Sequence, residues 1–207
     1  MFAQYAALWK ARAKLSLRVI AGTARGMRLK RVPGASTRPI MDRVKEALFN
    51  IIGSDIHGAN FLDLFAGTGS VGIEALSRGA AFAQFNERDP QALLTIRENL
   101  AHTRLAEKAR ITRSDAFKLI ARGPARRFRY IFVAPPQYRS MWQKSLAAFD
   151  ASPHWRHQDC QIIVQIDPDE FDETQCFGHL ESFDQRRYGR TMLIFYRFVD
   201  SASFPQG

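Results

Sequence analysis

The chain has 207 residues, of which 46% are hydrophobic, and this length suits one α/β domain with a small appendage. No apolar run approaches the length of a membrane span, and no signal-peptide pattern is present, so we expect a cytoplasmic protein without a membrane partner. Lysine and arginine number 30 against 20 acidic residues, a formal net charge of +10. This balance favours a polyanionic partner such as a nucleic acid, the alternative being a generally basic surface.

The two cysteines, Cys160 and Cys176, stand apart and lack the spacing of metal ligands. Each is therefore expected to be a buried small hydrophobe. His154, His157 and Asp159 lie near Cys160 in a loose group that we interpret as a polar loop. We expect no metal cofactor.

The first part of the chain is basic. Residues 1–16 form an alanine-rich extension with scattered basic residues, for which a weak amphipathic helix and a disordered arm are both open. Residues 17–35 alternate basic and apolar side chains around a glycine-containing turn, which predicts a small N-terminal β-hairpin. Arg18, Arg25 and Arg28 suit this hairpin to gripping RNA, although charge on an edge strand also prevents aggregation.

The remainder of the chain alternates strand and helix patterns. A helix is predicted to begin at Asp42, whose side chain can cap it, and to continue to about residue 52. Strands are predicted near 60–65, 81–86, 109–113, 129–133 and 160–166, and helices near 70–79, 89–102, 115–122 and 139–149. This order indicates a mostly parallel α/β sheet with helices on both faces. Two final apolar runs around Gly189 predict a C-terminal antiparallel hairpin, so that residues 36–199 form the main domain and 200–207 a tail.

The segment 61–72 is the most informative motif. An apolar run ends in a loop with glycines at Gly67, Gly69 and Gly72, and a helical pattern follows. Glu87 lies twenty residues after Gly67, at the end of the next apolar run. A carboxylate at that distance hydrogen-bonds ribose hydroxyls in nucleotide-binding βαβ units. The motif predicts a nucleoside-containing cofactor, the alternative being a tight turn without a ligand.

The surroundings of this loop favour one type of cofactor. Asp63 lies on the strand, and Phe65 and Ala66 open the loop. A carboxylate at the strand end suits a ligand with a positive charge or an amino group better than a pyrophosphate. S-adenosylmethionine carries a sulfonium and an α-amino group and has no phosphate, so it is the expected cofactor. A nicotinamide-dependent dehydrogenase is a distant alternative.

Two further strand ends carry candidate site residues. Asp115 and Ala116 follow the third strand, where they are placed to contact an adenine, although Asp115 is equally suited to capping the next helix. After the fourth strand, Pro135 and Pro136 force a rigid loop without backbone donors, and the aromatic Tyr138 follows. Such a loop can hold a flat base by stacking while carbonyl oxygens face its exocyclic amine, which is the geometry that amine methylation needs.

Over residues 17–198 the chain resembles the RsmD-type methyltransferases, which modify the exocyclic N2 amine of a guanine in small-subunit ribosomal RNA. The resemblance rests on four blocks of sequence: Arg18-Val19-Ile20-Ala21-Gly22 with Arg25-Gly26; Arg38-Pro39 with Asp42-Arg43-Val44-Lys45-Glu46-Ala47-Leu48-Phe49-Asn50; Phe65-Ala66-Gly67-Thr68-Gly69 with Gly72-Ile73-Glu74-Ala75-Leu76-Ser77-Arg78-Gly79; and the Pro-Pro-x-Tyr loop. The second block is the most specific, because many methyltransferases share the glycine motif.

The resemblance implies roles for individual residues. The methionine end of the cofactor would lie on Gly67, Thr68 and Gly69. The rest of the cofactor site would comprise Asp63, Phe65, Ala66, Glu87 and Arg88, with Asp115 and Ala116 at the adenine. The RNA-binding residues would be Arg18, Arg25, Arg28, Arg38, Asp42 and Arg43.

The sequence departs from the family pattern in the predicted catalytic loop, which comprises Ala134, Pro135, Pro136, Gln137 and Tyr138. Members of the family have Asp-Pro-Pro-Tyr or Asp-Pro-Pro-Phe, so Ala134 replaces the carboxylate that would accept a hydrogen bond from the target amine. Losing a polar partner of a transition state costs about 10²–10³ in rate. Three explanations are open. Backbone carbonyls with the Gln137 amide take the place of the carboxylate, or the substrate is another base or position, or catalysis has lapsed. We favour the first.

The sequence therefore predicts a class I, Rossmann-like methyltransferase that uses S-adenosyl-L-methionine. Its expected substrate is a guanine N2 amine in 16S rRNA or in a small ribosomal subunit particle, and the protein is expected to be a monomer. Two alternatives stay open: a methyltransferase for amines of DNA or other RNA, and an RNA-binding assembly factor without activity.

Overall fold

The computed structural model of the chain describes residues 17–34, 40–172 and 174–199. The expected extension 1–16, the tail 200–207 and the predicted RNA-binding residue Arg38 lie outside these residues.

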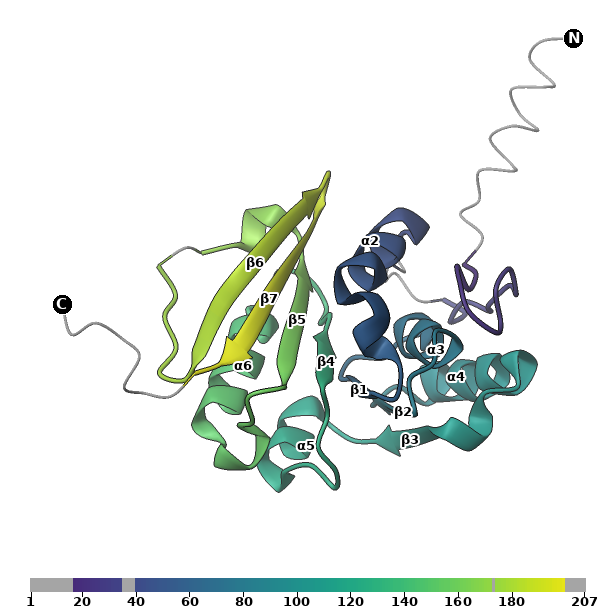
Figure 1. Cartoon of the computed structure of the whole chain (residues 1–207), viewed down its shortest axis with the longest axis horizontal. Coiled ribbons are helices and arrows are strands. Elements are labelled where there is room, and N and C mark those ends of the chain that lie inside the picture. Colours follow the sequence, from purple (N-terminus) through teal and green to yellow (C-terminus); the bar gives the residue numbers. More distant parts are fainter. Residues whose placement is uncertain (1–16, 35–39, 173, 200–207) are drawn as a thin grey trace, which may run out of the picture.

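The strands form one seven-stranded sheet in the order β3-β2-β1-β4-β5-β7-β6 (Figure 1). Neighbouring strands from β3 to β5 in this order are parallel, whereas β7 is antiparallel to both β5 and β6. The strands are β1 (Asn60–Asp63), β2 (Phe82–Glu87), β3 (Ala109–Arg113), β4 (Tyr130–Val133), β5 (Gln161–Ile166), β6 (Leu180–Tyr188) and β7 (Thr191–Phe198). The predicted mostly parallel α/β sheet with a C-terminal antiparallel hairpin is confirmed.

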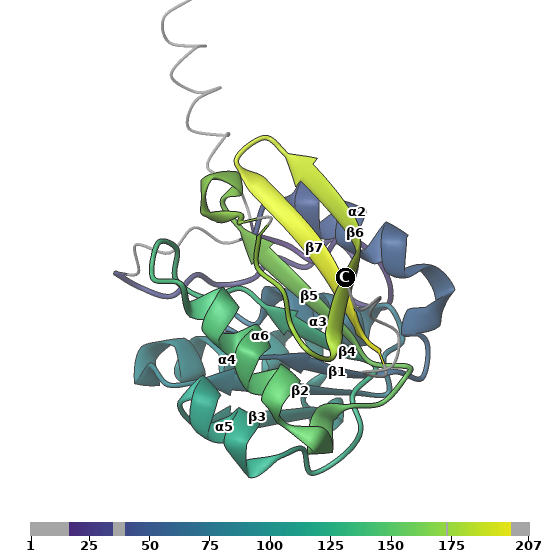
Figure 2. The ribbon, with the colours of Figure 1, turned by 90° about the vertical axis from the view of Figure 1, so that its left-hand side faces the viewer.

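Helices cover both faces of this sheet, as predicted. Their bounds within the described ranges are α2 (Asp42–Ile52), η1 (Gly53–Ile56), α3 (Ser70–Ser77), α4 (Pro90–Thr103), η2 (Ala106–Lys108), α5 (Ala116–Arg122), α6 (Met141–Ala151), η3 (Pro153–Trp155) and η4 (Pro168–Glu170). Side chains of α2, α3 and α4 share one hydrophobic core, and those of α5 and α6 share the other. Figure 2 shows α5 and α6 on the side of the sheet that faces the viewer.

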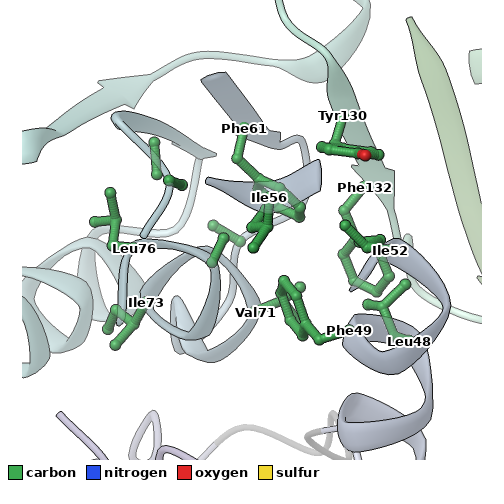
Figure 3. Packing of buried hydrophobic residues seen from close by; sticks show 14 of the residues in the cluster. Leu48, Phe49, Ile52, Ile56, Phe61, Val71, Ile73, Leu76, Tyr130 and Phe132 are labelled. Carbon is green, nitrogen blue, oxygen red and sulfur yellow. The ribbon is translucent and has the colours of Figure 1, made fainter. Parts of the chain in front are cut away.

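Aromatic side chains fill the core under α2 and α3 (Figure 3). Phe49 of α2 stacks on Phe61 of β1, with ring centroids 6.1 Å apart. Tyr130 and Phe132 of β4 lie beside them, and every residue of β4 is buried. A central parallel strand covered on both faces requires such a continuous apolar run, which explains why the sequence pattern located β4.

The predicted N-terminal β-hairpin is wrong. Residues 17–31 follow a hairpin-like path, and backbone hydrogen bonds such as Val19 N–H to the carbonyl of Met27 (3.0 Å) join its two arms. The contact amounts to one isolated antiparallel bridge, between Arg18 and Arg28, and neither arm forms a strand in the described structure. The reason lies in helix α3, because the backbone N–H groups of Ile20 and Ala21 donate to the carboxylate of Glu74 at 2.8 and 3.0 Å. These two N–H groups are therefore not available to form hydrogen bonds between two β-strands.

Glu74 is the centre of a buried polar network. Its Oε2 atom lies 3.5 Å from Nζ of Lys45 in α2, and both side chains are fully buried. Lys45 also donates to the carbonyl of Arg18 at 2.5 Å, and Arg78 donates to Glu74 Oε1 at 2.8 Å. Burial lowers the pKa of Lys45, although the charge of Glu74 opposes this shift. One carboxylate thus ties the basic N-terminal segment, α2 and α3 together.

Ser77 adds a second attachment one turn further along α3. Its hydroxyl donates to the carbonyl of Ala21 at 2.6 Å and accepts from the N–H of Ala24 at 3.0 Å. Gly22 passes so close to Ser77 that any Cβ atom there would overlap the serine carbonyl. This close contact by itself requires glycine at position 22.

Asp42 does not cap α2. The N-cap position is Met41, which makes no side-chain cap, and Asp42 is the first helical residue. Its carboxylate pairs with Arg18, with Nε and Oδ2 3.0 Å apart. An acidic residue in the first turn still favours the helix through its dipole, so the helix begins where it was predicted for a different electrostatic reason.

The two cysteines differ. Cys160 is buried as expected, and burial raises the pKa of its thiol to about 12. Cys176 is exposed in the connection between η4 and β6, so its expected burial is wrong. Among the described residues, no helix is both long and apolar enough to cross a membrane.

Replacing Glu74 with alanine is expected to lower the free energy of unfolding by about 3–5 kcal/mol, because Lys45 is left as an uncompensated buried charge. Urea titration measures this loss. The matched control is Glu98→Ala, which removes an exposed ion pair with Lys30 and should cost at most about 1 kcal/mol. Equal losses for the two variants would contradict the central place of Glu74.

Candidate cofactor and substrate site

The predicted site residues meet at the carboxyl ends of the parallel strands. Asp63 ends β1, Glu87 ends β2, Asp115 follows β3 and Ala134 follows β4. In open α/β sheets this edge is where ligands bind, at the point where strand order reverses. That reversal occurs here between β1 and β4, beside the glycine loop.

The glycine loop between β1 and α3 is held by Glu87. Its Oε2 atom accepts the N–H of Gly67 at 2.9 Å, while Oε1 accepts the N–H groups of Arg88 and Asp89 at 2.8 and 3.0 Å. Gly67 and Gly69 have φ angles of 54° and 75°, a region that favours glycine. The Glu87 residue as a whole is half-buried.

The three glycines of the motif have different structural reasons. A Cβ atom at Gly67 would meet no atom within 4 Å, which leaves the backbone of the loop open to close approach. A Cβ atom at Gly72 would instead overlap the ring of Phe85 in β2. Gly72 therefore serves the packing of α3 on the sheet, as the third glycine of dinucleotide-binding motifs does.

Asp63 lies beneath the loop, and its pKa is raised. Its side chain is buried, and Oδ2 accepts the N–H of Gly72 at 3.2 Å. Burial raises the pKa of Asp63 to about 7, the hydrogen bond from Gly72 opposes this shift, and the charge of Glu87 adds to it. Two carboxyl groups near one loop disfavour a ligand phosphate at this place.

Two asparagines that were not predicted from the sequence brace the site. Asn86 donates through Nδ2 to the carbonyls of Leu64 and Ser114, at 3.1 and 3.3 Å, and so connects the ends of β1, β2 and β3. Asn99 of α4 donates to the carbonyl of Thr68 at 2.9 Å. Both side chains are buried in the structure, where polar groups require hydrogen-bond partners. In the sequence each stands among polar as well as apolar residues, so no local pattern singles it out.

The structure places Asp115 at the N-cap of α5. Its Oδ1 atom accepts the N–H groups of Phe117 and Lys118 at 3.0 and 3.2 Å. The capping role is therefore confirmed, and contact with an adenine stays a prediction. Ala116 is buried next to it, and Phe65 is half-buried in the glycine loop.

The proline loop after β4 projects from the sheet. Ala134 and Pro135 are half-buried, whereas Pro136, Gln137 and Tyr138 are exposed. Tyr138 is 61% exposed and has a φ of 58°, a conformation that is uncommon for a non-glycine residue.

Neighbouring segments hold Tyr138 in place. Its N–H donates to Oε2 of Glu170 at 2.8 Å, and Nη2 of Arg190 lies 3.4 Å from its hydroxyl. Arg190 also pairs with the buried Asp167 after β5, at 3.2 Å. Burial alone would raise the pKa of Asp167, but hydrogen bonds from its neighbours, Tyr138 and Arg190 among them, hold it below the ordinary value. The β6–β7 turn thus supports the loop, which the sequence did not predict.

Among the predicted RNA-binding residues that the structure describes, Arg18 faces Arg28 across the antiparallel bridge and pairs with Asp42, which precedes Arg43 in α2. Arg25, Arg28 and Arg43 are exposed, and the described structure shows them on two different segments. Arg18 and Asp42 meet in the ion pair described above, which reduces the charge that Arg18 offers to a polyanion.

A hollow of about 460 Å³ lies at the opposite edge of the sheet, at the amino ends of β1, β4 and β5, and is separate from the site described here. Its polar lining includes Asp55, His57, Arg127, Arg129, His157 and Asp159. In the described part of the chain, no three His, Cys, Asp or Glu side chains are grouped so that they could hold a metal ion.

The strand order, the glycine loop and the acidic strand ends together define an α/β protein of the methyltransferase-like class. The family described as conserved hypothetical protein 95 matches residues 17–197, and the chain belongs to this family, which is the RsmD and YlbH family that its motifs resemble.

Individual relatives agree with this assignment. The chain is 39% identical over 183 residues to "Putative rRNA methyltransferase YlbH" of Bacillus subtilis, covering 87% of this chain and 98% of the relative. It is 38% identical over 149 residues to ribosomal RNA small subunit methyltransferase D of Escherichia coli K12, covering 72% and 74%. The solved structure titled "Putative methyltransferase yhhF from Escherichia coli" superposes with a TM-score of 0.76 at 31% identity, covering 88% of this chain and 98% of that one.

The raised pKa of Asp63 has a consequence for stability. Between pH 3.8 and about 7 the unfolded chain loses this proton while the folded chain keeps it, so stability falls as pH rises through this window. Relative to Asp63→Asn, the wild type is expected to lose up to about 1.4 kcal/mol per pH unit and to level off above the folded pKa. Urea titrations of both proteins from pH 4 to pH 8 measure the difference. A stability difference that stays constant, or that changes in the opposite direction, would contradict the buried neutral carboxyl.

Proposed function

We propose that this protein is a methyltransferase that uses S-adenosylmethionine and modifies the exocyclic N2 amine of a guanine in small-subunit ribosomal RNA. The observation that carries the proposal is the placement of the glycine loop, which Glu87 holds, and the Pro135-Pro136 loop at the adjacent carboxyl ends of β1 and β4. The names of its relatives support an rRNA substrate. Small-subunit particles and free rRNA are both compatible substrates, and we propose that a monomer acts on them.

The chemistry of the donor set fits this cofactor. The open backbone at Gly67 allows a ligand to approach the loop, and the carboxyl groups of Asp63 and Glu87 suit cationic and hydroxyl groups better than phosphates. Glu87 would accept the ribose hydroxyls, Gly67 and Gly69 would hold the methionine end, and Asp115 would face the adenine. When bound, the cofactor supplies a methyl group on a sulfonium.

The proline loop would orient the acceptor base. Pro135 and Pro136 have no N–H groups, so the loop offers carbonyl acceptors without competing backbone donors at these positions. Tyr138, fixed by Glu170 and Arg190, presents an exposed ring on which a base can stack. Acceptors that hold the hydrogens of the amine turn its nitrogen lone pair out of the ring and toward the methyl carbon. The nitrogen would then form a bond to that carbon as the carbon–sulfur bond breaks, S-adenosylhomocysteine would be the leaving group, and one amine proton would pass to water. Positioning would supply most of the rate.

The charge of the protein suits an RNA partner. Exposed arginines include Arg25, Arg28 and Arg43, and Arg190 stands next to Tyr138 at the site itself. With a formal net charge of +10, binding to rRNA should weaken steeply as salt rises, because bound counterions are released.

Ala134 supports a second candidate function, an RNA-binding assembly factor that no longer transfers methyl groups. Its methyl side chain offers no acceptor where the family pattern has a carboxylate. The same cofactor site would also serve a methyltransferase for amines of DNA or other RNA.

Methyl transfer from labelled S-adenosylmethionine separates these functions. The substrates are undermethylated small-subunit particles, naked 16S rRNA and duplex DNA, each followed by nucleoside analysis. The proposal expects N2-methylguanosine in the particle or in the rRNA. Labelled DNA would favour the DNA enzyme, and tight RNA binding without any transfer would favour the assembly factor.

Glu87→Ala is expected to weaken binding of S-adenosylmethionine at least tenfold, because hydrogen bonds to a charged acceptor contribute about 1.5–3 kcal/mol. Isothermal titration calorimetry measures the affinity. Glu107→Ala, which removes an exposed carboxylate in η2, is the matched control and should leave the affinity unchanged. Binding of the cofactor to Glu87→Ala as tightly as to wild type would place the ribose elsewhere.

A further inference from the structure

We propose that the side-chain carbonyl of Gln165 in β5 accepts a hydrogen bond from the target amine, in place of the carboxylate that position 134 lacks. This inference rests on the proposed function and deepens it. It assigns the polar acceptor of the transfer step to a neighbouring strand.

The strand register brings the two positions together. In the parallel pair β4 and β5, Phe132 is opposite Ile163 and Val133 is opposite Val164. The next residues in each chain, Ala134 and Gln165, are therefore lateral neighbours. Adjacent strands lie about 4.8 Å apart, which a glutamine side chain easily spans.

Both side chains lie on the face of the sheet that α2 and α3 cover. Phe132 and Ile163 belong to the core under α2 and α3, and Ala134 packs against the same core. Because side chains alternate between faces with a period of two, Gln165 shares this face. Asp63 is opposite Phe132 in the register of β1 and β4, so its side chain lies on that face too. Along the strand direction, Asp63 lies two residues before the level of Ala134 and Gln165.

The oxygen of Gln165 lacks a partner. Its Oε1 atom is buried, and in the described part of the structure it accepts no hydrogen bond. Leaving a buried acceptor unpaired costs free energy, so such an atom calls for an explanation. An amine brought to this end of the sheet beside Ala134 and Gln165 would supply the missing donor.

The chemistry of an amide oxygen fits this task. The carbonyl of glutamine accepts an N–H and carries no charge, so it can hold one hydrogen of the amine without needing a counterion. The small side chain of Ala134 adds no bulk between Gln165 and the proline loop. In the family pattern, one aspartate after the fourth strand accepts the hydrogen bond of the amine. Here Gln165 would supply this acceptor from the neighbouring strand, and Ala134 would leave the space beside it free.

Single-turnover methyl transfer to undermethylated small-subunit particles tests this assignment. The variants are Gln165→Met, which removes the acceptor at similar volume, Gln165→Glu, which keeps one, and Gln165→Met combined with Ala134→Asp. The matched control is Gln161→Met, because Gln161 lies on the same strand and face but at its amino end. Calorimetry with S-adenosylmethionine, filter binding to the particles and thermal melting accompany each rate.

We expect Gln165→Met to transfer about 100-fold more slowly than wild type, with both affinities and the melting temperature little changed. Gln165→Glu and the double variant should transfer at least tenfold faster than Gln165→Met. Gln161→Met should keep the wild-type rate. A structural role for Gln165 would not give recovery by Ala134→Asp.

Two results would overturn the inference alone while wild type remains active: a Gln165→Met rate within threefold of wild type, or a slow rate that neither Gln165→Glu nor Ala134→Asp restores. If the wild type transfers no methyl group to any RNA, the proposed function itself fails, and the role of Gln165 fails with it.

Discussion

The structure depends on one buried carboxylate. Glu74 of α3 accepts two backbone N–H groups of the N-terminal segment, pairs with Lys45 of α2 and binds Arg78. A buried charge is costly unless every partner is present, so these elements are expected to assemble together or not at all. This requirement gives a physical reason for the sequence blocks that surround Arg18, Lys45 and Glu74, none of which has to touch a ligand.

The same helix connects that network to the site. Gly69 begins α3 in a left-handed conformation, Gly72 donates to Asp63, and Glu74 follows on the next turn. The loop that is proposed to hold the cofactor therefore sits on a helix whose other side carries the basic N-terminal segment. Hydrogen bonds of the N-terminal segment and of the β1 end beneath the glycine loop thus converge on one short helix.

Local patterns predicted much of this molecule, and long-range contacts account for what they missed. The apolar runs located β1 to β5, and the spacing between Gly67 and Glu87 placed Glu87 at the end of β2. The hydrogen bond between the two residues was not predicted. The predicted hairpin failed because Glu74, over fifty residues away, captures its backbone donors. Strand order brings Arg190 to Tyr138 and places Gln165 beside Ala134. No local sequence pattern encodes strand order.

The central claim is that the carboxyl ends of β1 to β4 hold both the cofactor and the amine to be methylated. A crystal structure of the protein with S-adenosylhomocysteine tests it most directly. The account predicts the ribose hydroxyls at Glu87, the adenine beside Asp115 and the sulfur directed toward Ala134 and the proline loop. A ligand bound instead in the polar hollow beside Arg129, at the amino ends of the strands, would contradict it.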